Sequence, residues 1–451
     1  MARKATGFRV GSVQGYLRNR VWYLCYHEQG QRRRPRVGPD KDAARTMAAQ
    51  INAELASGAP TTMGFRPVAL TELQTSWLSH HEHVLRSSVQ TINRYRTATA
   101  HLLRFLQDVR PVRNTSLFSV QHAEEFVRYL RTIEVAPNGH KNTPKRRLLD
   151  KGVKYILETC RSMFNFALKR RHLSPYSENP FAALDLEKIP VENSKAVTLL
   201  SDDQEQKFLE ACDDWQLPIF ITLMLTGLRP GELTHLLLPD DLDLEAGLLR
   251  VQNKPRLGWM VKTRNERIIP LVSPLLAMFR SIINGRRTGP IVVRRRFWNS
   301  DDHPVLEASP SMMERELQRR VETAEREQER SLTRAERLTQ ARRLWVDAGS
   351  AKPDRIRTEF MRLTRRIGAG ELTSPKALRH LFATSLQDTN VDPLIRNELM
   401  GHSPAGARGG GSGLGMTAVY THTRWETKLK QLESSLAERP AFRIAETKYR
   451  F

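Results

Sequence analysis

The longest apolar run in the chain, LPIFITLMLTGL, covers residues 217–228 and limits what the chain can fold into. A helix that spans a lipid bilayer needs about 20 such residues. We therefore predict an apolar helix of a globular domain rather than a membrane span. The N-terminal residues MARKATGFRVGSVQGY carry early positive charge with no apolar stretch after them, so no secretory signal is predicted.

Charge is the second strong constraint. With 72 Lys and Arg against 49 Asp and Glu, the formal net charge is +23 and the isoelectric point is about 10.3. The excess is spread along the chain, which favours a polyanionic partner, nucleic acid first and an anionic membrane second. A chain of 451 residues that is 39% hydrophobic can form two or three domains with real cores.

The three cysteines, Cys25, Cys160 and Cys212, lie far apart and form no CxxC pair. This usage suits a reducing cytosol and argues against a zinc module. The histidines of SHHEHV (79–84) also lack the i, i+4 spacing of a helical zinc site. We predict no metal and no cofactor.

Residues 1–58 predict a small β-rich module closed by a helix. VWYLCY (21–26) has strand composition, EQGQ (28–31) is a turn, and RRRPRVG (32–38) can return as one basic strand. Asp40 is a candidate N-cap for a helix over 40–55. The basic strand is either a solvated face or a DNA-reading sheet. Its candidate DNA contacts are Arg32, Arg33, Arg34 and Arg36.

Residues 57–67 predict a linker, and 68–184 predict an all-helical block, because apolar residues repeat there at three and four positions. Segment 153–173 ends in a cationic cluster. Cations complement the dipole at a helix C-terminus without any ligand, so the cluster is only a candidate DNA contact: Lys169, Arg170 and Arg171, followed by His172. Residues 185–197 predict a second linker.

The third region, 198–437, opens on a helix that Ser201 can cap with Gln204 three residues on. A charged insertion interrupts it at about 300–353, and residues 309–345 within it are helix-forming. Thr333 and Glu336 can cap a second helix, which predicts a helical hairpin. The insertion is either a solvated structural element or a partner-binding coiled coil. Residues 438–451 are left as a C-terminal tail, either docking or frayed.

Two stretches of this region place a cation at a bend. LTGLRPGEL (225–233) puts Arg229 at a Gly/Pro bend after the apolar helix. Residues 248–252, 259–263 and 267–271 predict three short antiparallel strands, with Lys262 at the edge of the last turn. The acidic run PDDLDLE (239–245) is interpreted as the turn into the first strand rather than a magnesium site.

Two further stretches follow. In LTSPKALRHLFATSL (372–386), Pro375 starts a helix that places Lys376 and Arg379 on one face. ELMGHSP (398–404) contains His402, and the glycine-rich GGGSGLGMTAVYTH (409–422) then leads to Tyr420.

Taken in order, TGLRPGEL, VKTRNERIIPL, SPKALRHLFATSL, LMGH and AVYTH resemble the motifs of the tyrosine recombinase (phage integrase) family, over residues 226–422. SMFNFALKRRHLSPYSENPF (162–181) is similar to that family's core-binding domain, and the N-terminal module more loosely resembles its arm-binding domains. The resemblance implies a mainly α fold with small β-sheets: a β-rich arm-binding-like module, a helical core-binding domain and an α+β catalytic domain.

Carried over position by position, the resemblance implies that Tyr420 is the nucleophile and that Arg229 and Arg379 bind the scissile phosphate. It also implies that Lys262 protonates the leaving 5′ oxygen and that His402 completes the phosphate pocket.

Lys376 falls where most members of the family carry histidine. A protonated amine is a poor base, so the group that takes the tyrosine proton is left open. The remaining chemistry agrees with the residues. Attack on a phosphodiester needs fixed cations at its oxygens, for which guanidinium forks are suited. An ammonium can supply the leaving-group proton, and a phenol forms a covalent phosphotyrosine.

The glycine-rich segment departs from the family, because eighteen positions separate His402 from Tyr420, about twice the usual number. The extra residues, roughly AGARGGGSGL, have the composition of a flexible tether. They either let the Tyr420 segment swing between inactive and attacking positions or form a tolerated loop insertion.

The sequence thus predicts a DNA integrase or recombinase of a mobile element, acting through a 3′-phosphotyrosine. Strand exchange needs four active sites on two duplexes, so a homotetramer on double-stranded attachment sites is implied, with or without accessory DNA-bending proteins. We expect a cytoplasmic protein of the bacterial nucleoid. Two other classes stay open: a type IB topoisomerase, which rejoins the original strand, and a non-catalytic DNA-binding regulator.

Overall fold

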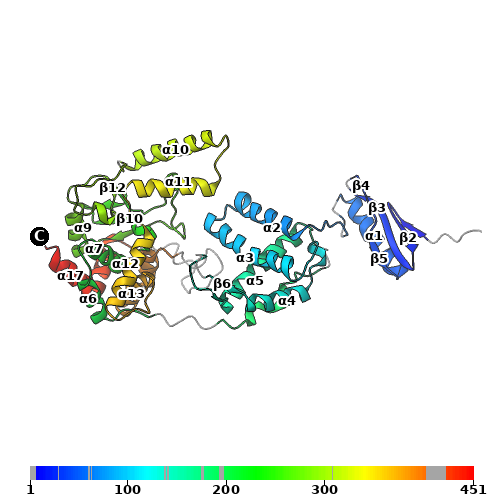
Figure 1. Cartoon of the computed structure of the whole chain (residues 1–451), viewed down its shortest axis with the longest axis horizontal. Helices are drawn as coiled ribbons and strands as arrows, with labels where there is room; N and C mark the ends of the chain where they lie inside the picture. Colours follow the sequence, from blue (N-terminus) through cyan, green and yellow to red (C-terminus); the bar gives the residue numbers. More distant parts are fainter. Residues whose placement is uncertain are drawn as a thin grey trace, which may run out of the picture. The chain divides into compact units, whose positions relative to one another are not determined.

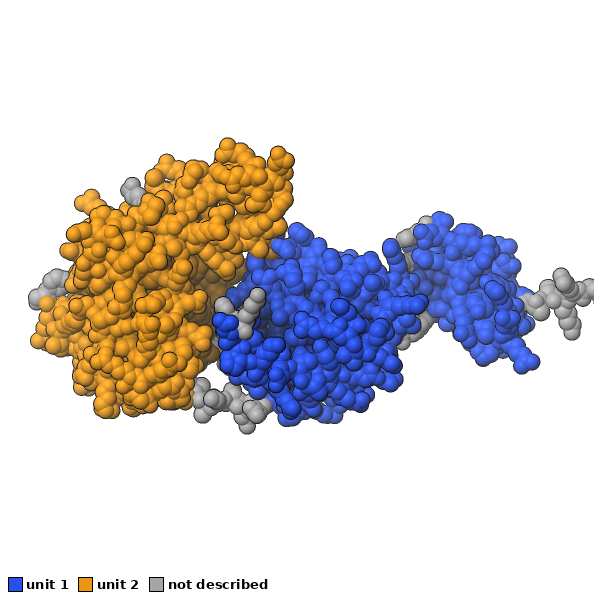
Figure 2. Space-filling model, in the orientation of Figure 1, with its two compact units in different colours: residues 1–194 blue, residues 195–451 orange. Residues whose placement is uncertain are grey.

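The computed structural model describes residues 7–450 except 29, 59–60, 62, 137–138, 140–141, 174–176, 192–197, 307 and 403–422. The chain divides into two compact units, residues 1–194 and 195–451 (Figure 2). As predicted, it is mostly helical with small antiparallel sheets. The finer division of residues 1–184 into an arm-binding-like module and a core-binding domain stays a prediction.

The N-terminal sheet is antiparallel and contains β1 (Gly7–Val10), β2 (Val13–Arg18), β3 (Val21–Glu28), β4 (Gln31–Arg33) and β5 (Arg36–Gly38), with β5 paired to β3 (Figure 1). Trp22, Leu24 and Tyr26 of β3 alternate onto one face and pack with α1 (Lys41–Ala56). The predicted cap is confirmed, since Asp40 accepts a hydrogen bond from the Asp42 amide at 2.8 Å.

The predicted single basic strand over 32–38 is wrong. Pro35 has no N–H to donate, and it separates β4, which carries Arg32 and Arg33, from β5, which begins at Arg36. Arg34 lies exposed between the two strands. The four arginines therefore do not share one strand. Arg33 also pairs with Glu28 at 3.5 Å.

The rest of the first unit is built from α2 (Leu70–Ser79) with a π-turn η1 (His80–Val84), α3 (Val89–Asp108), α4 (Val120–Thr132) and α5 (Asp150–Lys169). These helices enclose an aromatic core that includes Trp77, Phe105, Phe126, Phe164 and Phe181. Two short antiparallel strands of two residues each, β6 (Glu134–Val135) and β7 (Arg146–Arg147), depart from the all-helical prediction. Short 3₁₀ turns are η2 (Thr115–Leu117), η3 (Ala182–Leu184) and η4 (Leu186–Lys188).

In the second unit the apolar run forms α7, whose every residue is buried in the core. The predicted capping box is confirmed, because the Gln204 amide donates to Ser201 Oγ at 3.2 Å. No helix within the described ranges is long and apolar enough to cross a bilayer. Outside the charged insertion, the helices among the described residues of this unit are α6 (Asp202–Glu210), α7 (Gln216–Thr226), α8 (Pro230–Leu233), α9 (Ser273–Ile283), α12 (Pro353–Arg366), α13 (Lys376–Asp388), α14 (Pro393–Met400), α16 (Trp425–Leu436) and α17 (Pro440–Lys448).

A three-stranded sheet has the order β11 (Arg267–Pro270), β10 (Leu248–Val251), β9 (Leu242–Asp243), and β8 (Leu237–Leu238) pairs with β12 (Gly289–Pro290). The predicted strand over 259–263 is wrong. Pro255 starts a 3₁₀ turn, η5 (Pro255–Leu257), and Gly258 adopts φ +66°, so only Trp259 forms a bridge, to Lys254.

The acidic run 239–245 is only partly the predicted turn, because it consists of a turn after β8, strand β9 and the start of the turn into β10. Asp241 is fully buried and pairs with Lys254 at 2.7 Å. Asp243 lies on β9 and pairs with Arg250 at 3.1 Å.

The charged insertion forms the predicted hairpin, in which α10 (Pro310–Glu327) and α11 (Arg334–Asp347) lie side by side (Figure 1). The predicted cap of the second helix is present, with the Glu336 amide donating to Thr333 Oγ1 at 3.3 Å. The hairpin has its own apolar cluster, distinct from the main core of the unit.

The residues expected as a tail, 438–451, contain α17, which packs on α6, α7 and α9. Ala441 and Ala445 belong to the main core, and Arg439 forms a buried ion pair with Glu205. Helix α16 packs on α13 and β11 of its own unit. The C-terminal residues 440–448 are therefore part of the compact second unit.

Candidate active site

Arg229 is placed by the abrupt end of α7. Gly227 ends that helix with φ +62°, and a Cβ atom there would lie 2.4 Å from Phe382 Cδ1, so both the turn and the close approach require glycine. Arg229 then becomes the N-cap residue of α8, with its side chain about one quarter exposed at 26%. The motif GLRP thus places the Arg229 guanidinium at the start of α8, directly after the buried helix α7.

Glu232 orients Arg229. Its Oε1 atom accepts from Arg229 Nη1 at 2.6 Å, and its Oε2 atom accepts from the Arg229 amide at 3.0 Å. Although burial raises the pKa of this carboxyl, hydrogen bonds and charge from Arg267 and Arg229 outweigh it, so the pKa is lowered. Glu232 is therefore a carboxylate at neutral pH and holds the guanidinium in one direction.

Arg267 completes this network and is not among the site residues predicted from the sequence. It is buried at the start of β11, where Nη2 donates to Glu232 Oε2 at 2.7 Å and Nε donates to the Leu399 carbonyl at 2.8 Å. No apolar pattern predicts its burial, because Arg267 faces inward while its neighbour Ile268 is 51% exposed. Apolar alternation alone assigns the two residues to the opposite faces.

Arg379 projects from α13 and is buried, with 6% of its surface exposed. Its Nη1 donates to the Gly227 carbonyl at 2.5 Å, and its Nη2 donates to the Met400 carbonyl. Burial and then the charge of Arg229 lower the pKa of this guanidinium to about 10. Arg379 thus joins the C-terminal ends of α7 and α14, where a cation is favoured.

His402 follows the end of α14 and is the last described residue before the gap at 403–422. Partial burial and the charges of Arg379, Arg229 and Arg267 lower its pKa below 6.5. Glycine at position 401 allows His402 to lie close to the arginines. Gly401 adopts φ +60°, and a Cβ atom there would lie 3.0 Å from Arg267 Nη1. The imidazole is therefore neutral at pH 7 and lies within the field of the three arginines.

Lys262 is exposed in the turn before β11. Its neighbour Thr263 donates from Oγ1 to the Gly401 carbonyl at 3.3 Å. The turn that carries Lys262 is thereby tied to the residue preceding His402.

The remaining two candidates are less connected. Lys376 is the exposed first residue of α13, one turn before Arg379. Tyr420 lies outside the described residues, as does the glycine-rich stretch before it. Of the six predicted residues, the structure thus brings together Arg229, Arg379 and His402, with the Lys262 turn beside them.

The cationic cluster of the first unit is partly structural. Arg171, with φ +56°, donates from Nη1 to the Thr61 carbonyl at 2.8 Å, and its own carbonyl accepts from the Arg66 amide at 2.8 Å. Lys169 and Arg170 are exposed, with the Arg170 guanidinium 5.5 Å from the Phe166 ring centre. Arg171 is therefore bonded to Thr61 and Arg66, and Lys169 and Arg170 stay candidates for DNA contact.

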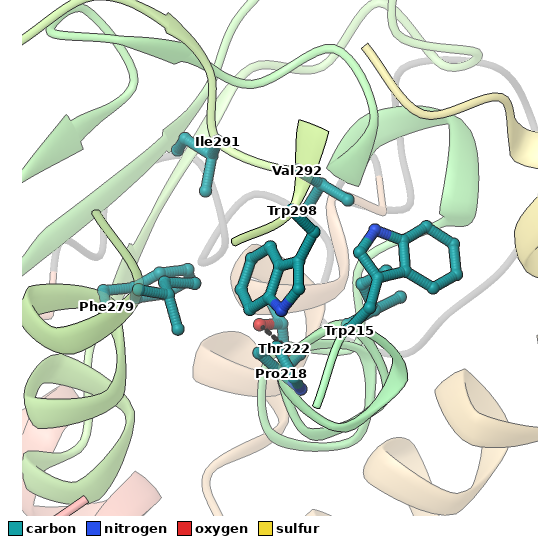
Figure 3. Close-up of a pocket in the computed structure, with 9 residues that line it drawn as sticks. Trp215, Pro218, Thr222, Phe279, Ile291, Val292 and Trp298 are labelled. Carbon is teal, nitrogen blue, oxygen red and sulfur yellow. Dashed lines mark hydrogen bonds between the residues drawn. The ribbon is translucent and has the colours of Figure 1, made fainter. Parts of the chain in front are cut away.

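An apolar pocket lies beside α7 (Figure 3), and no arginine is among the residues that line it. The indole of Trp215 on its wall donates to the Val293 carbonyl at 2.9 Å. No charged side chain lines it, so it is a packing gap of the core. The lining consists of Trp215, Pro218, Ile219, Thr222, Phe279, Ile282, Ile291, Val292 and Trp298.

Among the described residues, no group of three or more His, Cys, Asp or Glu is arranged to hold a metal ion.

Guanidinium groups from α8, α13 and β11, of which Arg267 and Arg379 are buried, converge near the carboxylate of Glu232, an arrangement whose chemistry suits a phosphate group. Comparison with known proteins agrees. The sequence model of the phage integrase family matches residues 198–425. The chain is 35% identical over 100 residues to tyrosine recombinase XerA of Saccharolobus solfataricus, which covers 22% of this chain and 32% of that protein.

The chain is also 24% identical over 315 residues to tyrosine recombinase XerD of Vibrio cholerae, which covers 66% of this chain and 76% of that protein. Among solved structures, the Tn1549 transposon integrase in complex with transposon right end DNA is similar, with 17% identity, a TM-score of 0.49 and coverage of 81% of this chain and 99% of that chain. The chain belongs to the phage integrase family, the tyrosine recombinases, which break and rejoin DNA strands.

Proposed function

We propose that this chain is a site-specific recombinase of a mobile element, which exchanges DNA strands through a 3′-phosphotyrosine on Tyr420. The observation that carries the proposal is the arginine pair. Arg379 holds the Gly227 carbonyl two residues before Arg229, and the charge of each arginine acts on the same His402. Two forks held this way suit the non-bridging oxygens of one phosphate.

In the proposed first step, Tyr420 Oη attacks the phosphorus, the Oη–P bond forms and the bond from phosphorus to the 5′ oxygen breaks. Lys262 gives a proton to that departing oxygen. In the second step the 5′-hydroxyl of a partner strand attacks the phosphotyrosine, so the bond energy is retained and tyrosine is released.

The base that takes the Tyr420 proton is a separate question. Lys376 carries no proton-accepting lone pair while it is an ammonium, and it is exposed. His402 has a lowered pKa and is neutral at pH 7, so it has one ring nitrogen able to accept. We assign to Lys376 a contact with the phosphate rather than the role of base.

Exchange of both strand pairs needs four active sites, so the proposed active form is a homotetramer on two duplexes, in the cytoplasm at the nucleoid. Attachment-site DNA is the proposed partner, read in part by the exposed Arg32, Arg34, Arg36, Lys169 and Arg170.

The test is covalent trapping on randomly nicked DNA from the source organism, since cleavage beside a nick releases the short strand and leaves the adduct stranded. Sequencing the DNA attached to the protein also identifies the site. We expect adducts with the wild type and with Tyr449→Phe, and none with Tyr420→Phe. Tyr449 is a suitable control because burial raises its pKa to about 12.

The two alternatives give different results in the same experiment. A type IB topoisomerase forms adducts without sequence preference and relaxes supercoiled DNA. A non-catalytic DNA-binding relative binds DNA and forms no adduct at all.

A further inference from the structure

The α10–α11 hairpin docks its inner face on the loop that leads to Lys262. Trp345 of α11 is buried, and its indole Nε1 donates to the Leu257 carbonyl at 3.0 Å. Leu257 in turn belongs to the apolar cluster of the hairpin, the dock, which consists of Leu237, Leu257, Ala308, Met313, Leu317, Ala341, Leu344, Trp345 and Ala348.

The hairpin and the loop also interlock through their backbones. Gly258 has φ +66°, and a Cβ atom there would lie 2.5 Å from Ala341 Cβ. Helix α11 therefore lies against the loop so closely that only glycine fits. The conformation of residues 255–259 therefore depends on the position of α11 against them.

An aromatic stack extends the dock toward Arg229. His235 stacks on Trp259 with ring centres 5.0 Å apart and meets Trp345 edge-on at 4.5 Å. Its Nδ1 atom is bonded to the Gly231 carbonyl of α8 at 2.7 Å. A side chain of the inserted hairpin thus contacts both the loop before Lys262 and the segment after α8.

Hydrogen bonds connect the docked loop to the turn that carries Lys262. The Lys254 and Trp259 backbones bond each other in both directions, at 2.9 and 3.0 Å. The next residue back, Asn253, accepts from the Val261 amide at 2.9 Å and donates to the Arg264 carbonyl at 3.2 Å. Asn253 therefore closes the turn on both sides of Lys262 and joins it to the docked loop.

We propose that the hairpin is a positioning element for Lys262, acting through Trp345 on the docked loop, and not a solvated insertion without influence on the reaction. This inference rests on the proposed role of Lys262 as the proton donor. Trp345 contacts the loop through Leu257 and would act on Lys262 through it, so Trp345 is a positioning residue. The outer face of α11 carries the exposed Arg342 and Arg343, which supply a matched control on the same helix.

The experiment compares cleavage of two synthetic duplexes with the sequence recovered by trapping. One is ordinary DNA, and the other has sulfur in place of the bridging 5′ oxygen at the cleaved phosphate. A thiolate leaves without receiving a proton, so the second duplex does not need the acid. General acid catalysis contributes about 10²- to 10⁴-fold, so Lys262→Ala should lose about that factor on ordinary DNA only.

We expect Trp345→Ala to slow cleavage of ordinary DNA by about tenfold or more, because small displacements of a catalytic group are costly, and to leave the sulfur duplex near the wild-type rate. Trp345→Phe keeps an aromatic ring and loses the indole N–H, so its rate on ordinary DNA should lie between those of the wild type and Trp345→Ala. Arg342→Ala/Arg343→Ala should match the wild type on both duplexes.

Three results bear on the inference separately. Equal slowing of both duplexes by Trp345→Ala and by Trp345→Phe would make the dock a general structural support and overturn it. Wild-type rates for both variants on ordinary DNA would overturn it as well. If Lys262→Ala itself slows both duplexes equally, the acid role in the proposed function is wrong, whatever the Trp345 variants do.

Discussion

Glu232 and Arg267 form a buried ion pair, with Oε2 and Nη2 2.7 Å apart. Each of the two also supports a second group: Glu232 orients Arg229, and Arg267 holds the Leu399 carbonyl just before the Gly401–His402 segment. The pair therefore couples the two sides of the candidate phosphate site.

Glu232→Gln should destabilise the fold and reduce cleavage, because it leaves the charge of Arg267 buried without its partner. Removing one member of a buried pair costs about 3 to 5 kcal/mol, and the amide retains some hydrogen bonding, so we expect about 2 to 4 kcal/mol. Urea denaturation at pH 7 measures it. The exposed Glu245→Gln is the control and should be neutral; a similar loss in both variants would contradict the coupling.

The pKa of Glu232 gives this stabilisation a pH range. Since the folded pKa lies below 4.5, the contribution is present above the unfolded pKa of 4.5 and is lost as the pH falls through the folded value. The difference in stability between wild type and Glu232→Gln should therefore shrink in acid.

Arg379→Lys should reduce cleavage by about 10²- to 10³-fold, the usual cost of removing one oriented donor at a developing charge. A lysine offers one point charge and cannot bond the Gly227 and Met400 carbonyls while facing a phosphate. Single-turnover cleavage checks this at saturating protein. Arg443→Lys, at a 60% exposed side chain of α17, should be unchanged; comparable losses in the two would argue against a specific site.

Gly401→Ala should disturb the site more than its backbone strain alone explains. Its Cβ would meet Arg267 Nη1 at 3.0 Å and Cδ at 3.1 Å, at a φ of +60°. Gly368 is the matched control, because its φ is +77° and nothing lies within 4 Å of a Cβ there. We expect both variants to lose some stability, and only Gly401→Ala to lose cleavage. Equal activities of the two would remove Gly401 from the site.

His235 should make the hairpin dock acid-sensitive. Burial lowers its pKa to about 4 from 6.5. A group with a lowered folded pKa of this kind takes up its proton more readily when unfolded, so stability falls as the pH drops from 6.5 to 4. A shift of this size is worth up to about 3 kcal/mol. Denaturation between pH 4 and 7 should show the slope, and His235→Phe should flatten it; an unchanged slope would refute the assignment.

The sequence located Arg229, Arg379 and His402 because each sits in a short motif, and the motifs occur in the family's order. It predicted the capped helices at Asp40, Ser201 and Thr333 for a similar reason, since each cap is local. The same approach failed where a distant contact decides the structure.

Arg267 is defined by a bond to Leu399, 132 residues away, and Trp345 by one to Leu257, 88 residues away. No local pattern contains such contacts. The wrong strand over 259–263 has a local origin instead, because Asn253 and Gly258 favour a closed turn there. The basic strand over 32–38 failed at one local signal that was present, Pro35.

The most direct test of the account is to identify the amino acid that carries the DNA. Trypsin cuts after Arg408 and Arg424, so the peptide 409–424 contains one tyrosine, Tyr420. After covalent trapping, nuclease treatment and mass spectrometry, we predict a nucleotide 3′-phosphate on that residue of the wild type, and none in Arg379→Ala. A nucleotide on any other residue, or efficient strand exchange by Tyr420→Phe, would contradict the account.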